Sequence, residues 1–183
     1  MPTVNNSTYF IKNEAGYSFN NQNFGNYIML GGKYTSNYGN LEAGLAFKTS
    51  LTSVGGFFEG KYTTPKFGKS NLALESRTRM QVDKAYGKDN ADSSLAERLA
   101  VKGSWDLGKG LSLYEIAGLN AKISMQGDGL KSLTPMSLTG LGYNVNKKLN
   151  IYLEGELSKT YDLKNECWDR FSPAVYVGAK YTF

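Results

Sequence analysis

Charged side chains at every second position are the groups in this sequence that could do chemistry. Side chains two residues apart on an extended strand project from the same face. Two consecutive segments therefore present a row of cations, and a later segment presents a pair of carboxylates. The residues concerned are Glu75, Arg77 and Arg79, then Arg98 and Lys102, then Glu154 and Glu156, with Lys180 near the end of the chain.

Several kinds of chemistry lack the residues they need. The chain has no histidine, the usual general base, and its single cysteine, Cys167, allows no internal disulfide. The segment 55–62 comes close to a phosphate-binding loop, but Tyr62 stands where serine or threonine must bind Mg²⁺. We therefore expect no enzyme activity, no metal site and no cofactor.

The charge balance indicates which partners are plausible. A net charge of +5 suits anionic lipopolysaccharide or anionic solutes. No basic run with interleaved aromatic residues is present, so nucleic acid is not expected as a partner.

The elements that carry these residues are predicted to be strands throughout. Apolar and polar residues alternate along nearly the whole chain, which is typical of strands with two different faces. The predicted strands cover residues 9–19, 28–35, 41–48, 58–63, 72–83, 95–107, 111–124, 136–140, 149–158 and 174–183.

The seventh segment does not fit one continuous alternation. Glu115 and Lys122 have opposite parity, so a regular strand cannot turn both side chains to the same face. A β-bulge near Gly118 would reconcile them.

The last strand carries a family resemblance. It alternates from Ala174 to the end, with Tyr181 two residues before the final Phe183. This resembles the closing strand of bacterial outer-membrane β-barrels, such as small barrels of the OmpA, OmpX and Opc kind and porins. The resemblance implies that the last strand pairs with the first, that the insertion machinery recognises Phe183 and Tyr181, and that short turns and both termini face the periplasm while longer loops face outside.

Together these features predict an all-β protein, an antiparallel up-and-down transmembrane β-barrel of about ten strands, with eight or twelve as alternatives. Residues 1–183 would form one domain, with 1–7 a flexible periplasmic segment, and the barrel would be a monomer in the bacterial outer membrane in contact with lipid and lipopolysaccharide. The chain begins without a signal peptide, so we interpret it as a mature chain with an added initiator methionine.

Side-chain volume predicts which face is inside. The apolar set holds tyrosine, phenylalanine, tryptophan and leucine, too much volume for the lumen of a ten-stranded barrel. The polar set includes Gly16, Gly44, Ala46 and Gly178, which would leave room for long charged neighbours. Charges would then face inward and aromatic residues would face lipid. The alternative is a lipocalin-like soluble barrel with an apolar pocket.

Two functions remain open. The first is a narrow porin-like channel for small ions or anionic solutes, lined by the eight charged residues named above. The second is a lumen plugged by pairing of these charges, with recognition by the outer loops 84–93 and 161–170, as in a surface adhesin or receptor. The amphipathic residues Tyr86, Lys88, Tyr161 and Trp168 would then form the binding surface. Oligogalacturonate-type porins also resemble the chain, but they are longer and usually have twelve strands.

Overall fold

The computed structural model describes residues 6–68, 70–127 and 129–183, and in these it forms ten long strands. Residues 1–5 of the predicted flexible segment lie outside the described residues, whereas Asn6 and Ser7 already belong to the first strand. The strands are β1 (Asn6–Ser18), β2 (Asn23–Ser36), β3 (Gly39–Ser50), β4 (Ser53–Thr63), β5 (Leu72–Ala85), β6 (Asp92–Gly108), β7 (Leu111–Ser124), β8 (Leu130–Asn144), β9 (Leu149–Asp162) and β10 (Cys167–Thr182).

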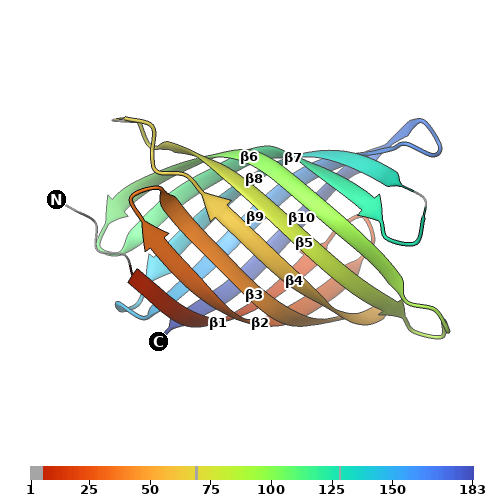
Figure 1. The fold of residues 1–183 in the computed structure, drawn as a ribbon, viewed down its shortest axis with the longest axis horizontal. Coiled ribbons are helices and arrows are strands. Elements are labelled where there is room, and N and C mark those ends of the chain that lie inside the picture. Colours follow the sequence, from red (N-terminus) through yellow and green to blue (C-terminus); the bar gives the residue numbers. More distant parts are fainter. Residues whose placement is uncertain (1–5, 69, 128) are drawn as a thin grey trace.

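The strands follow one another around a closed antiparallel barrel, with steeply tilted strands and both termini at the same end (Figure 1). The barrel closes between β1 and β10, whose register runs from Phe10 opposite Thr182 to Ser18 opposite Ala174. The backbone N–H of Phe183 adds a hydrogen bond of 2.9 Å to the carbonyl oxygen of Tyr9. The predicted ten-stranded up-and-down barrel, closed by its last strand against its first, is confirmed.

The two faces of each strand separate as the alternation predicts. Leu153 and Val177 are 52% and 57% exposed on the outside, whereas Arg98 and Glu75 are 4% and 2% exposed inside. A soluble barrel would show the reverse. The lipocalin-like alternative is therefore wrong, and the exterior is the apolar face that a membrane-spanning barrel presents to lipid.

Exposed aromatic residues gather towards the two ends of the barrel. Tyr9, Tyr34 and Tyr38 lie towards the end with the termini, and Phe19, Phe24, Trp168 and Phe171 lie towards the opposite end. Such paired girdles are typical of transmembrane barrels, because these rings are most stable at the two membrane–water interfaces.

The connections differ from the prediction of uniformly short turns at one end and long loops at the other. The longest connection, 64–71, lies at the end with the termini, while the opposite end has connections 19–22, 51–52, 86–91, 125–129 and 163–166. The strands continue into segments that the sequence predicts as loops. They do so because extended hairpins keep satisfying each other's backbone N–H and C=O groups.

The predicted bulge near Gly118 is also wrong. The ladders of β7 with β6 and with β8 run without interruption through Gly118, and the only irregularity of β7 against β8 lies between Lys122 and Ile123. Glu115 therefore stays exposed on the outside while Lys122 faces the interior. A bulge at mid-strand would leave backbone groups unpaired at membrane depth, which is costly.

Among the described residues, no helix is long and apolar enough to cross a membrane.

Candidate pore and its charged lining

All eight predicted lumen residues lie around one central cavity of about 310 Å³. They come from β5, β6, β9 and β10, and the tilt of the strands brings them to a common depth. Further lining residues come from β1 to β4 and from β7 to β10, and those with charge or a ring are Lys12, Glu14, Tyr27, Glu42, Glu59, Lys61, Tyr114, Tyr152 and Tyr176.

The arginines of β5 are held by a carboxylate on the neighbouring strand. Glu59 of β4 accepts hydrogen bonds from Nε and Nη2 of Arg79 at 2.9 and 2.5 Å, and it lies 3.6 Å from Nη1 of Arg77. The guanidinium of Arg79 also lies 4.2 Å from the ring centroid of Phe57. These contacts fix the direction in which Arg79 extends from the wall.

Arg98 is the most deeply buried cation of the lining. Its Nη2 donates to Glu75 at 2.6 Å, and its Nη1 lies 3.6 Å from the sulfur of Met136. The Nε of Arg98 is buried and has no hydrogen-bond partner among the described residues. A buried pair of this kind is stable only while both partners are present.

The arginines of β5 and β6 therefore pair with carboxylates on a neighbouring strand. The described ion pairs of Arg77, Arg79 and Arg98 go to Glu59 and Glu75 on β4 and β5 and do not cross the lumen to β9. A plug in which these arginines pair with Glu154 and Glu156 is not what the structure contains. Glu59 and Glu42 were missed as site residues, although the alternation of β3 and β4 already turns both inward.

The carboxylates of Glu154 and Glu14 accept hydrogen bonds from tyrosine hydroxyls and not from arginines. Tyr114 donates to Glu154 at 2.5 Å, and Tyr152 donates to Glu14 at 2.7 Å. Glu14 also pairs with Lys12 at 2.9 Å. Glu154 thus faces the cavity, and no cation of the described chain forms an ion pair with it.

Interior tyrosine rings lie across glycines of the adjacent strand. Tyr176 lies opposite Gly16, Tyr152 opposite Gly178 and Tyr114 opposite Gly140 in the ladders. A Cβ atom on any of these glycines would come within 2.2 or 2.3 Å of the ring. The inward glycines therefore make room mainly for tyrosines and not, as predicted, for arginine and glutamate side chains.

Near the end with the termini the lining contains a bridged carboxylate. Glu42 of β3 lies 2.9 Å from Nζ of Lys180 and 3.0 Å from Nζ of Lys61. The ammonium of Lys180 also lies 4.0 Å from the ring centroid of Phe10. This cluster joins β10 to β3 and β4 across the interior.

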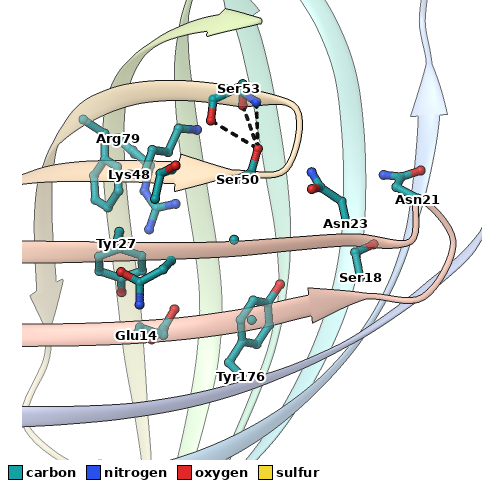
Figure 2. A pocket seen from close by; sticks show the side chains of 15 residues that line it. Glu14, Ser18, Asn21, Asn23, Tyr27, Lys48, Ser50, Ser53, Arg79 and Tyr176 are labelled. Carbon is teal, nitrogen blue, oxygen red and sulfur yellow. Dashed lines mark hydrogen bonds between the residues drawn. The ribbon is translucent and has the colours of Figure 1, made fainter. Parts of the chain in front are cut away.

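Two further cavities lie between the central cavity and the end opposite the termini. One, of about 310 Å³, is formed by β1 to β5 and β10, where Glu14, Tyr27, Lys48, Arg79 and Tyr176 turn into the same space (Figure 2). At its rim Ser50 hydrogen-bonds with Ser53, which fixes the turn between β3 and β4.

The other cavity, of about 390 Å³, is lined by cations, amides and hydroxyls. Arg77, Arg79, Arg98 and Lys122 supply the charge, and no carboxylate is among its described lining residues. Neutral hydrogen-bonding groups complete it, and these are Gln81, Asn120, Ser132, Thr134 and Thr160. Of the described residues, Arg79 alone lines all three cavities, so its side chain stands where they meet.

Two parts of the interior wall are apolar, and the first is a buried cluster of Phe10, Met29, Ala46 and Phe57. Ile116, Met136 and Leu138 pack with Ala100 in a buried cluster, and Tyr114 packs against it. The buried side chain of Arg98 lies against this second cluster, through its contact with Met136. The alternation of the sequence predicts these strands but not that apolar residues share the lumen.

The four residues predicted for loop recognition come from two different hairpins. Tyr86 and Lys88 lie in the β5–β6 connection, where the backbone N–H of Tyr86 bonds to the carbonyl of Thr52. Tyr161 and Trp168 face each other across the β9–β10 hairpin with ring centroids 5.1 Å apart. The two pairs therefore belong to separate hairpins.

Within the described part of the chain, no three histidine, cysteine, aspartate or glutamate residues come together in a group that could hold a metal ion.

No protein-family model matches the sequence, and no curated protein matches it. Solved structures do resemble the fold. The NanC porin matches with a TM-score of 0.50 and 10% identity, over 93% of this chain and 98% of that one. The KdgM porin matches with a TM-score of 0.47 and 12% identity, over 95% and 99%. At this identity the likeness to the NanC porin concerns the fold alone. This chain has the small, closed transmembrane-barrel fold that its sequence predicts.

Proposed function

We propose that this protein is a non-enzymatic outer-membrane channel that passes small ions and small anionic solutes through the lumen. The observation that carries the proposal is the central cavity, lined by the predicted charged residues and sharing lining residues with two cavities nearer the end opposite the termini. A lumen filled by side chains would not leave these spaces. The porin-type fold is consistent with this function.

The charges that line the central cavity and its cationic neighbour favour anions over cations. The central cavity is lined by seven cationic and six carboxylate side chains, so its charge is nearly balanced. The neighbouring cavity lined by Arg77, Arg79, Arg98 and Lys122 holds no described carboxylate. An anion that enters there would meet guanidinium donors, which bind carboxylates and phosphates well. Selectivity would therefore be set at the junction formed by Arg79.

The location and partners follow from the same proposal. The apolar exterior would contact outer-membrane lipid and lipopolysaccharide, and Phe183 and Tyr181 would be read by the barrel-insertion machinery. The adhesin or receptor alternative would use Tyr86 and Lys88 on one hairpin and Tyr161 and Trp168 on another, and the cavities of the lumen favour the channel over it.

Planar-bilayer recording tests the proposal. The purified chain should give discrete conductance steps with a reversal potential that favours anions. The double variant Arg77→Ala/Arg79→Ala should raise the conductance, because two bulky side chains leave the junction. It should also shift selectivity towards cations, because carboxylates would then outnumber cations in the central cavity.

A matched control removes two positive charges elsewhere. Lys147→Ala/Lys148→Ala changes two exposed lysines of the β8–β9 turn and should leave conductance and selectivity nearly unchanged. Silence of the folded wild-type protein at all voltages, or equal effects of the two double variants, would contradict the channel.

A further inference from the structure

Most of the outside of the barrel is apolar, but one patch on β7, β8 and β9 carries polar and small residues. Glu115, Ala117, Ser137, Thr139 and Gly155 are all exposed there, and we call them the small polar face. The ladders place Glu115 opposite Thr139 and Thr139 opposite Gly155, with Ala117 opposite Ser137 one step along. These residues form one contiguous patch.

The ladders place the small polar face just inside the aromatic girdle at the end with the termini, since Trp105 lies opposite Leu113, one outward position from Glu115. Leu113, Leu141 and Leu153 form an outward-facing ladder row directly beside Glu115 on the side of the termini. On the other side, Leu119 of β7 is exposed beyond Ala117. The carboxylate of Glu115 is thus bounded by apolar side chains on both sides along its strand. Charged groups on the lipid face of a barrel are destabilising there.

Another outward-facing carboxylate, Glu97, has a strong partner on its own chain, but Glu115 does not. Thr78 donates to Glu97 at 2.6 Å. The described contact of Glu115 is a hydroxyl donated by Thr139 at 3.5 Å, the outer limit of a hydrogen bond. No cation of the described chain pairs with it.

We infer that the small polar face is the contact surface for a second copy of this chain. Every copy inserts in the same direction, so the patch lies at the same depth in each. A two-fold axis along the membrane normal would set β7 of one copy against β8 of the other. Glu115 of each copy would then face the hydroxyls of Ser137 and Thr139 on its partner, an interface that is complementary to itself.

Side-chain size supports the same contact. Ala117 and Gly155 project little from the surface, so two backbones can approach closely, as small residues allow in membrane proteins. Lipid offers no hydrogen-bond donor at this depth, whereas a second copy supplies two per carboxylate. This inference gives a dimer where a monomer is expected from the sequence. This inference needs the barrel to span a membrane but does not need it to conduct.

Disulfide crosslinking in phospholipid vesicles tests the surface. In a Cys167→Ser background, Ser137→Cys should crosslink into dimers several-fold more than Leu45→Cys, an exposed position on β3 at the opposite side of the barrel. Equal crosslinking at the two positions would overturn the inference, because random collisions do not distinguish the faces.

A second measurement uses energy transfer between labelled copies. With Glu115→Leu we expect the dissociation constant of the dimer to rise at least about tenfold, because two modest hydrogen bonds per carboxylate, four per two-fold interface, are lost. Glu115→Gln keeps a hydrogen-bonding side chain and should retain the dimer. Heat-dependent gel mobility confirms that each variant is folded. A dimer that tolerates Glu115→Leu, or a wild type that stays monomeric at every protein-to-lipid ratio, would contradict the inference.

Discussion

Arg98 and Glu75 form a pair whose energy depends on both partners. Burial of a charge costs more than its pairing returns, so removing one partner leaves the other uncompensated. Few residues in the lining are as enclosed as these two. The stability of this part of the wall therefore rests on the pair as a unit.

A double-mutant cycle measures this dependence. We expect Arg98→Met to lower the free energy of unfolding by ~3–5 kcal/mol, and Arg98→Met/Glu75→Leu to lie close to the wild type, as for other buried ion pairs replaced by apolar residues. Urea titration of the folded barrel in detergent gives both values. Additive losses in the double variant would show that the two residues act independently.

Gly178 shows how a single inward position accommodates a ring. A Cβ atom there would lie 2.2 Å from the Tyr152 ring, so the ring must move and its hydrogen bond to Glu14 is disturbed. We expect Gly178→Ala to destabilise the barrel by ~1–3 kcal/mol, the usual cost of overpacking. The same urea titration measures it.

Gly60 provides the control for that substitution. It lies in β4, and a Cβ atom on it would meet nothing within 4 Å. Gly60→Ala should therefore leave the unfolding midpoint unchanged or slightly raised. A loss at Gly60 equal to that at Gly178 would mean that glycine is needed for its backbone and not for the space it leaves.

At the scale of elements, closure depends on residues 174–181 of β10, which pair with β1 on one side and with β9 on the other. Neither edge of this segment is free, so its backbone N–H groups lie in ladders. Proline within this segment removes one ladder hydrogen bond and clashes with the neighbouring strand.

We therefore expect Val177→Pro to abolish the heat-dependent mobility shift of the folded barrel on a gel. Val177→Ala changes the same lipid-facing side chain without touching the backbone and should retain the shift. A folded band for the proline variant would mean that β10 is not needed to close the barrel.

For the whole molecule, the two tryptophans report how the barrel sits in the membrane. Trp105 lies on β6 towards the end with the termini, and Trp168 lies on β10 towards the opposite end. Both belong to girdles that should rest at opposite membrane–water interfaces.

Fluorescence quenching by brominated lipids measures this depth. In Trp105→Phe and Trp168→Phe variants, the remaining tryptophan should be quenched more by bromines near the headgroup than by bromines at the bilayer centre. Strong central quenching of either tryptophan, or none at all, would contradict the transmembrane placement.

The sequence by itself determined the fold and the orientation of its faces. Alternation is local, with a period of two residues, so it can be read one strand at a time. It turns Arg77, Arg98, Glu154 and Lys180 inward and Val177 outward, whatever strands lie beside them. The closing role of the last strand follows from its resemblance to outer-membrane barrels.

Only the tertiary structure decided which of these residues meet. Ladder register and strand tilt are properties of the closed ring, and many cross-strand partners of similar energy are compatible with one alternation pattern. Arg79 therefore pairs with Glu59 and not with β9, and tyrosines occupy the space left by inward glycines. Glu115 stays outside because breaking the backbone ladder at membrane depth would cost more than leaving one carboxylate on the outer face.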